Sequence, residues 1–328
     1  MFLGVDGGGT KTAYTLIDSQ GNIRASHLTG SVSHLSEGVA RAAALLVEGA
    51  GAVLTMAATD AARVTFAYFG LPSYGEDSAT TAQLDAMPSS LFGASQYRCG
   101  NDMICSWAGS LACRDGISVI AGTGSMAYGE YAGRAARAGG WGELIGDEGS
   151  AYWIAREGMN LFSRMSDGRA PRGPLYALVR KRLGIESDLD LCPRIYGQNA
   201  NTRGAFAQFA RLVHDAAESG DALARAIFVR AGDELVATVL AVRRSLQVPQ
   251  AVVLPVSYTG GAFAGSPTLI GAFNDALTAT QSAFDCRAPL YPPVIGAALY
   301  AARHAGKPLS DEALTNLREQ CATAGLPQ

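Results

Sequence analysis

Two short glycine-rich segments combine backbone amides with hydroxyl side chains, a combination suited to binding phosphate. Asp6-Gly7-Gly8-Gly9-Thr10-Lys11 follows an apolar run at residues 2–5, and Gly122-Thr123-Gly124-Ser125 follows another at residues 117–121. Glycines lack a Cβ, so successive N–H groups can turn toward an anion. The first segment matches neither a P-loop nor a G-x-G-x-x-G that opens a helix. We therefore expect two hairpins that hold a polyphosphate, with contacts from Gly8, Gly9, Thr10, Lys11, Gly122, Thr123 and Gly124.

Two further features suit a nucleotide with a bound cation. Asp6 ends the first strand beside its hairpin, where a carboxylate can hold Mg²⁺ through water, although it can equally be an acidic turn residue. The turn Thr259-Gly260-Gly261-Ala262-Phe263 follows an apolar strand expected at residues 251–256. We expect Gly260 and Gly261 to lie flat against an adenine ring; a tight turn without ligand is the alternative.

Asp102 is the candidate for proton transfer. It stands where a β-like segment (residues 96–99) gives way to a helix expected to end near Ala112. Asp is also a favoured N-cap, which is the purely structural interpretation. Phosphoryl transfer to an alcohol needs a positioned carboxylate that accepts the hydroxyl proton. Asp102 fits this role best, with Asn101 beside it as an orienting or capping residue.

The segment from Gly139 to Ser150 places five glycines, one tryptophan and three acids directly before a predicted helix. Carboxylates and backbone groups in such a loop commonly bind sugar hydroxyls. The acids can instead favour the helix N-terminus, and tryptophan is more often a core residue. The hypothesis is a sugar loop in which the contacts come from Gly140, Trp141, Gly142, Asp147 and Glu148.

The strand, glycine turn and return strand occur twice, so the chain is predicted to be an α/β protein of two duplicated domains with a cleft between them. We expect the domains at residues 1–115 and 116–304, with a last helix at about 305–328 packing back on the first. The helices expected from apolar spacing lie at residues 36–48, 102–112, 150–165, 204–218, 221–246, 267–280 and 294–304.

Length and composition agree with this organisation. The chain has 328 residues, enough for two domains, and a formal charge of −3, which offers no basic face for nucleic acid. The acidic Asp6 interrupts the first apolar run and no run approaches ~20 apolar residues, so we expect a cytoplasmic protein without a membrane partner. The six cysteines lack C-x-x-C spacing and are expected to be reduced, structural thiols.

Taken in order, these motifs resemble those of N-acetylglucosamine kinases, a family in the BadF/BadG/BcrA/BcrD branch of the actin, Hsp70 and sugar kinase fold. The most specific part is Gly139-Gly140-Trp141-Gly142 followed by residues 146–155 (GDEGSAYWIA). The resemblance spans nearly the whole chain and thins between residues 165 and 250.

The resemblance implies two actin-like ATPase (ribonuclease H-like) domains, ATP and Mg²⁺ as cofactors, and a homodimer. It implies that Asp102 is the catalytic base, that Thr10 and Thr123 contact ATP phosphates, and that residues 140–144 and Asp147 bind the sugar. The acceptor would be the 6-hydroxyl of an amino sugar. Ser33, His34 and Ser125 are also expected at the sugar. Ser33 and Met126 stand where the animal enzymes carry asparagines, so the choice between N-acetylglucosamine and glucosamine stays open.

Two alternatives come from other functional classes. One is an ATPase activator of the same branch, which needs cysteines placed for a shared iron–sulfur cluster; no cysteine closely follows Gly122 to Ser125. The other is a sugar sensor without catalysis, which would be expected to lack the base that Asp102 provides. A DNA-binding repressor of the superfamily would carry an N-terminal helix-turn-helix, whereas this chain opens on a strand.

Overall fold

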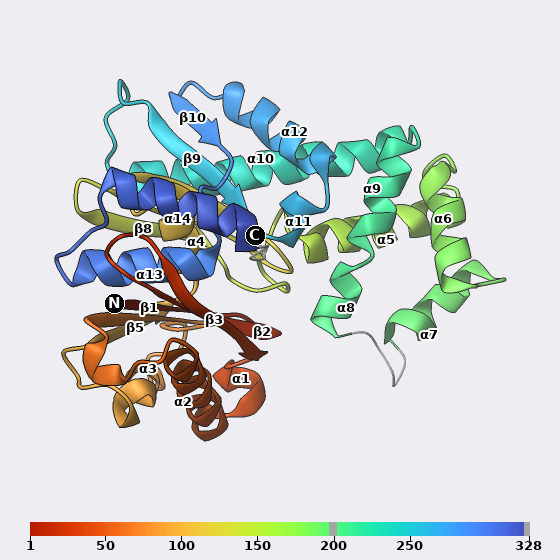
Figure 1. Ribbon diagram of the computed structural model, residues 1–328. Helices are drawn as coiled ribbons and strands as arrows, with labels where there is room; N and C mark the ends of the chain where they lie inside the picture. Colours follow the sequence, from red (N-terminus) through yellow and green to blue (C-terminus); the bar gives the residue numbers. More distant parts are fainter. Residues whose placement is uncertain (197–201, 325–328) are drawn as a thin grey trace. The chain divides into compact units, whose positions relative to one another are not determined.

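The computed structural model describes residues 1–196 and 202–324. The chain divides into two compact units (Figure 1). The first contains residues 1–115 together with the described residues from 288 onward, and the second contains Gly116–Arg287. Each unit is built around one five-stranded sheet.

The first sheet has the strand order β3-β2-β1-β4-β5. β1 pairs antiparallel with β2, and β2 with β3, whereas β4 is parallel to β1 and β5 is parallel to β4. Leu3, Val5 and Phe69 are fully buried in its core, as apolar strands covered on both faces require. The strands are β1 (Phe2–Gly7), β2 (Lys11–Ile17), β3 (Ile23–Gly30), β4 (Phe66–Leu71) and β5 (Tyr97–Asn101).

Helices cover both faces of this sheet: α2 (Val39–Met56) lies on one side and α13 (Pro293–His304) on the other (Figure 1). A helix over residues 36–48 was expected. The structure instead has a short α1 (His34–Glu37), then Gly38 at φ +74°, a left-handed conformation that interrupts the helix, and α2 starts afresh at Val39. The remaining elements are η1 (Ala61–Arg63), α3 (Thr81–Asp85), η2 (Met87–Ser90), α4 (Met103–Leu111) and α14 (Asp311–Ala324).

α13 packs on β1 and α4 of the first unit, whereas the sequence-based division placed its residues in the second domain. Glycines, which have no side chain, allow the backbones to approach closely at this contact. A Cβ on Gly4 would lie 2.3 Å from the Ala298 amide nitrogen, and one on Gly296 would lie 2.1 Å from the Cys105 carbonyl oxygen. The order of elements along the chain does not reveal which sheet a helix will cover.

The last helix, α14, also contacts the first unit. The Asn316 side chain donates to the Gln20 carbonyl at 2.9 Å, and the Tyr291 hydroxyl donates to the Leu314 carbonyl at 2.7 Å. The first bond holds α14 against the turn between β2 and β3, and the second links it to the segment before α13. The final part of the expected helix, residues 325–328, lies outside the described residues.

Among the described helices, α2 alone is long and apolar enough to cross a membrane, judged by length and composition only. The core helix of a folded domain meets the same criteria. Ala42, Leu46 and Val53 of α2 are completely buried against the first sheet, so this helix has a packing role in the unit.

The second sheet repeats the first, with the order β10-β9-β6-β7-β8. β6, β7 and β8 form an antiparallel meander, and β9 and β10 are added in parallel. The strand expected at residues 251–256 begins later, because residues 249–252 form a turn closed by the Val252 amide on the Pro249 carbonyl at 3.0 Å. The strands are β6 (Gly116–Ala121), β7 (Ser125–Tyr131), β8 (Arg134–Gly139), β9 (Leu254–Thr259) and β10 (Phe284–Arg287).

The second unit carries most of the helices. α10 (Ala222–Ser245) contacts β6, β7 and β8, and α5 (Ala151–Ser166) packs on α9 (Ala210–Glu218). One helix was expected over residues 204–218, but i→i+3 bonds at Gln208 and Phe209 separate α8 (Arg203–Ala207) from α9. The other helices are α6 (Pro174–Leu183), η3 (Asp188–Asp190), α7 (Leu191–Tyr196), α11 (Gly261–Ala264) and α12 (Pro267–Thr278).

Candidate active site

The first glycine segment is a tight hairpin between β1 and β2. The Gly8 amide donates to the Lys11 carbonyl at 2.9 Å, so this N–H is used by the turn. Gly9, Thr10 and Lys11 are exposed, and a Cβ on Gly9 would meet no atom within 4 Å. Packing therefore does not require glycine at position 9. In this hairpin, Gly9, Thr10 and Lys11 are therefore the residues that remain available to contact a phosphate.

Ser31, a residue that the sequence analysis did not single out, connects Ser33 to this hairpin by hydrogen bonds. The Ser31 hydroxyl donates to the Gly8 carbonyl at 2.9 Å and accepts from the Ser33 amide at 3.0 Å. Ser33 and His34 then begin α1 and keep only 8% and 9% of their surface exposed. Their contact with sugar stays a prediction.

The first unit brings Asp6 and Asp102 together with a thiol. Asp6 is in β1 and Asp102 directly precedes α4; the Cys105 Sγ lies 3.7 Å from the Val5 carbonyl and hydrogen-bonds to Asp6. Gly70 makes this arrangement possible. A Cβ there would be 2.2 Å from Cys105 Sγ and 3.2 Å from Asp102 Cα. Cys105 and Gly70 were absent from the sequence-based site because their role depends on how α4 packs against the paired strands β1 and β4.

Burial, together with the nearby carboxylates of Asp6 and Glu76, raises the pKa of Asp102 to about 8. Burial also raises the pKa of Asp6 to about 6, opposed by the Cys105 hydrogen bond and by Lys11. Among the described residues, neither acid forms a salt bridge. The pair therefore resists full ionisation and retains proton affinity near neutral pH.

Asn101, rather than Asp102, caps helix α4. The Asn101 Oδ1 accepts from the Met103 amide at 3.1 Å, and its Nδ2 donates to the Tyr74 carbonyl at 3.1 Å. Asp102 stands at the N-cap position without a side-chain capping bond. The residue as a whole is partly exposed, and its carboxyl group makes no capping bond at the helix end. The purely structural interpretation of Asp102 therefore loses its main support.

Asp6 is compatible with Mg²⁺. In the described parts of the chain, no group of three or more His, Cys, Asp or Glu side chains is arranged to hold a metal. Mg²⁺ is usually held by one or two carboxylates with waters and substrate phosphates, so a complete protein cage is not needed. A buried carboxylate at a strand end, without an ion-pair partner among the described residues, fits that donor set.

In the second unit, the Gly122 hairpin, the start of α5 and the Gly260 turn meet. The Gly122 amide donates to the Gly124 carbonyl at 2.9 Å, and the Ala151 amide of α5 donates to the Gly122 carbonyl at 2.9 Å. Gly260 has φ +103°, and a Cβ there would lie 2.4 Å from the Ala121 carbonyl oxygen. The expected phosphate and adenine turns thus share one corner of this unit, with Gly261 opening the short helix α11.

The sugar loop is bonded to the same hairpin through Ser125. The Ser125 carbonyl accepts from the Gly140 amide at 2.9 Å, and its hydroxyl donates to the Glu148 carbonyl at 2.6 Å. The Ser125 amide points to the Asp147 Oδ1 at 3.4 Å. Ser125, which directly follows the predicted phosphate residues Gly122 to Gly124, therefore forms one hydrogen-bonded cluster with the predicted sugar loop.

Asp147 is 2% exposed and adopts φ +57°, which is uncommon for a residue other than glycine. Its Oδ2 forms an ion pair with Arg203, which also contacts Glu143 at 3.0 Å. Burial raises the pKa of Asp147, whereas Arg203 opposes this rise. Arg203 was missed because it lies where the family resemblance thins, and a pair separated by 56 residues leaves no local signal.

Trp141 lies at the surface of this loop. Its side chain is 70% exposed, and the neighbouring Leu144 and Ile145 are 87% and 77% exposed. The alternative that Trp141 is a core residue is therefore wrong. An exposed aromatic plate beside Asp147 suits the expected cover over a sugar ring.

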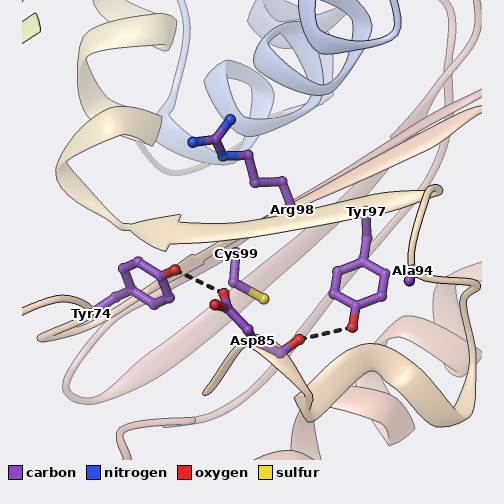
Figure 2. Close-up of a pocket in the computed structure, with 6 residues that line it drawn as sticks. All are labelled: Tyr74, Asp85, Ala94, Tyr97, Arg98 and Cys99. Carbon is purple, nitrogen blue, oxygen red and sulfur yellow. Dashed lines mark hydrogen bonds between the residues drawn. The ribbon is translucent and has the colours of Figure 1, made fainter. Parts of the chain in front are cut away.

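A cavity of about 320 Å³ lies in the first unit, away from the predicted contact residues (Figure 2). The Tyr74 hydroxyl donates to Asp85 Oδ1 and the Tyr97 hydroxyl donates to the Asp85 carbonyl, both at 2.8 Å. Figure 2 shows Arg98 on the opposite side of β5 from these rings. Through the bond from Asn101 to Tyr74, this cluster supports the segment beside Asp102. The lining residues are Tyr74, Asp85, Ala94, Tyr97, Arg98 and Cys99.

Comparison with known protein families identifies the chain. The model of the BadF/BadG/BcrA/BcrD ATPase family matches residues 3–301. The chain belongs to the BadF/BadG/BcrA/BcrD ATPase family. The match covers both sheets, both glycine hairpins and the sugar loop, as the motif series predicted.

Two relatives of this chain are named as kinases that act on N-acetylglucosamine. An N-acetyl-D-glucosamine kinase of Dictyostelium discoideum is 30% identical over 270 residues, which cover 80% of this chain and 85% of the relative. An N-acetylmuramic acid/N-acetylglucosamine kinase of Clostridium acetobutylicum is 38% identical over 143 residues, 43% of this chain and 46% of the relative.

A solved structure shows the same fold. It belongs to a candidate N-acetylglucosamine kinase of Chromobacterium violaceum, with a TM-score of 0.68 and 28% identity, and the match covers 90% of this chain and 97% of that one. The predicted fold class, two duplicated actin-like ATPase domains of α/β type, is confirmed by this likeness and by the repeated strand order.

Proposed function

We propose that this protein is an ATP-dependent amino-sugar kinase that phosphorylates the 6-hydroxyl of N-acetylglucosamine or glucosamine. The N-acetylglucosamine kinase of Dictyostelium, similar over 80% of the chain, supports the reaction class. The observation that carries the proposal is Asp102: a carboxyl group beside Asp6, not committed to a helix cap, whose pKa burial raises to about 8. Such a group suits proton acceptance from an alcohol.

In the proposed reaction, the sugar 6-oxygen attacks the γ-phosphorus of ATP while Asp102 accepts the hydroxyl proton. The new bond joins the sugar oxygen to phosphorus. The bond that breaks joins the γ-phosphorus to the β,γ-bridging oxygen, whose electron pair leaves with ADP. The products are a sugar 6-phosphate, ADP and a protonated Asp102, which then releases its proton to solvent.

For ATP, we assign the phosphates to Thr10 and Thr123 with their neighbouring glycines, and the adenine to the turn at Gly260 and Gly261. The contact between the Gly260 turn and Ala121 supports placing adenine next to a phosphate hairpin. Asp6 would hold Mg²⁺ through water, and the cation would supply positive charge against the phosphate oxygens when bound.

For the sugar, we assign Asp147 to hydroxyl binding, with Trp141 as a cover over the ring. The bonds from Ser125 to Asp147 and to Glu148 support a loop whose shape is coupled to the phosphate hairpin. We also assign contacts to Gly140, Gly142, Glu148, Ser33 and His34. The choice between an acetylated and a free amino group would be decided at these positions.

The two compact units are proposed as the two domains of the kinase, with the chain crossing back to the first after Arg287. We infer a cytoplasmic homodimer acting on a small molecule. The formal charge of −3, which disfavours nucleic acid as a partner, agrees with this assignment.

The ATPase activator of the same branch is a weaker candidate. Cys99 and Cys105 precede the Gly122 hairpin and are both buried, so neither presents a surface thiol for a cluster shared between subunits. A purified protein that carried iron would nevertheless support the activator over the kinase.

The test is a coupled ADP-release assay with ATP and Mg²⁺ across N-acetylated, free-amino and plain hexoses. We expect turnover that depends on an amino sugar and a sugar 6-phosphate among the products. ADP release that is equal with and without every sugar would contradict the kinase and favour the activator or a sensor.

A further inference from the structure

Arg203 links the two acids of the sugar loop from a separate element. It is the first residue of α8, and Thr202 caps that helix through a bond to the Ala205 amide at 3.3 Å. Its Nε lies 3.0 Å from Glu143 Oε2, and its Nη2 contacts Asp147 Oδ2. The guanidinium group thus forks between a partly exposed acid and a buried one.

The ion pair with Arg203 favours the charged form of the Asp147 carboxylate. The charged groups that face it are Arg203 from α8 and Glu143 from its own loop, and the Ser125 amide of β7 approaches only to 3.4 Å. Burial and Glu143 both raise the pKa of Asp147, whereas Arg203 lowers it. Without the guanidinium, a carboxylate that is 2% exposed would be stabilised by one long hydrogen bond.

Gly124, in the hairpin between β6 and β7, leaves space for the ion pair of Arg203 and Asp147. A Cβ on Gly124 would lie 2.6 Å from Arg203 Nη2 and 2.7 Å from Asp147 Oδ2. Gly124 was predicted to contact phosphate, but the ion pair is a sufficient reason for glycine at this position. The backbone of the hairpin and the side chain of α8 therefore both shape the surroundings of Asp147.

We propose that Arg203 is a positioning residue of the sugar site, which orients Asp147 and keeps it charged so that it accepts hydrogen bonds from sugar hydroxyls. An ionised carboxylate offers about four acceptor positions, so the bonds to Arg203 and Ser125 leave room for ligand hydroxyls. This inference rests on the proposed function, because it takes Asp147 as the group that binds sugar.

The test measures the dissociation constant of N-acetylglucosamine and of glucosamine by titration calorimetry between pH 5.5 and 8.5. The background is Asp102→Asn, which removes the titration of the base, and Arg203→Ala and Arg203→Lys are added to it. We expect Arg203→Ala to weaken binding at least tenfold at pH 6, with recovery as the pH rises. Loss of Arg203 should raise the pKa of Asp147, so the charged form returns only at higher pH. Arg203→Lys should restore part of the affinity.

Two controls separate this role from a structural one. Arg169→Ala removes an arginine of similar exposure that pairs with Asp167 at 2.7 Å, and should leave binding unchanged. Thr202→Ala removes the side-chain cap of α8 but keeps Arg203, and should change binding by less than about threefold. A loss in Arg203→Ala that is independent of pH, or an equal loss in Thr202→Ala, would overturn the proposal by assigning the effect to the placement of α8.

Failure of the proposed function has a different result. If the protein without the Arg203 change binds neither amino sugar and releases ADP independently of sugar, both the function and this inference fail. If it binds an amino sugar and Arg203→Ala binds it equally well at every pH, only the inference fails.

Discussion

Asp102 of the first unit and Asp147 of the second are both enclosed carboxyl groups, each next to a glycine hairpin, but their neighbours have opposite charge. Asp102 faces the acids Asp6 and Glu76, and its pKa rises to about 8. Asp147 faces Arg203, which opposes the effect of burial on its pKa. One duplicated architecture therefore presents two carboxyl groups whose pKa burial raises, one among acids that add to the rise and one beside an arginine that opposes it.

This difference agrees with the two proposed roles. A base works best when its proton affinity lies near the working pH, whereas a residue that only accepts hydrogen bonds should stay ionised. The sequence places both aspartates shortly before helices, and only their tertiary neighbours give them different electrostatic surroundings. The predictions below test whether the two acids differ in this way.

The largest expected effect comes from Asp102→Asn. Loss of the base should lower kcat about 10²- to 10⁴-fold in the ADP-release assay, because the hydroxyl proton has no acceptor. Binding of sugar should remain measurable by calorimetry, since the amide keeps the shape of the side chain. Turnover close to that of the unchanged protein would show that Asp102 is not the base.

Asp147→Asn should act mainly on binding. Hydrogen bonds to a charged group contribute about 1.5–3 kcal/mol, so we expect the KM for the sugar to rise about 10- to 100-fold. The fall in kcat should be much smaller than for Asp102→Asn. Steady-state kinetics at saturating ATP separate the two parameters, and an unchanged KM with a collapsed kcat would reverse the assigned roles.

The two glycine hairpins should respond differently to an added methyl group. Gly124→Ala places a Cβ 2.6 Å from Arg203, so we expect the affinity for sugar to fall several-fold as the ion pair shifts. Gly9→Ala meets no atom within 4 Å and should leave both the melting temperature and the affinity for sugar unchanged. If Gly9 approaches phosphate, its variant should instead raise the KM for ATP. Equal effects of both variants on sugar and ATP would contradict the distinction.

The smallest effect is on stability. Asp102 has a pKa raised from 3.8 to about 8 by folding, so its protonated form stabilises the native state below pH 3.8. That stabilisation is lost as the pH rises through about 8. Asp102→Asn is neutral at every pH, so its melting temperature should exceed that of the unchanged protein by a margin that grows across this window.

Scanning calorimetry in EDTA without nucleotide would measure this margin, because bound cations would alter the charge balance at Asp6. Asp275→Asn, on the exposed side of α12, serves as the control and should show no such trend. A margin that shrinks as the pH rises would show that Asp102 is not held in its protonated form by the fold.

Much of the fold could be predicted from local patterns. The apolar runs before Gly7 and Gly122 predicted β1 and β6, and the repeat of strand, turn and strand predicted two duplicated domains, which agrees with two sheets that share one strand order. The bounds of helices were less accurate. Gly38 interrupts the helix expected at residues 36–48, and the β9 strand begins at Leu254 rather than Ala251, because turn geometry and strand pairing decide these positions.

The sequence alone determined the α/β class, the duplication, the glycine hairpins and the acids of the site, because these depend on residue types and spacings within one short segment. Tertiary structure decided which residues surround each acid. Asp6 and Gly70, from the paired strands β1 and β4, lie next to Asp102, and Arg203 reaches Asp147 from α8. Electrostatic energy depends on distance in space, so the charge state of each aspartate is a property of the folded chain.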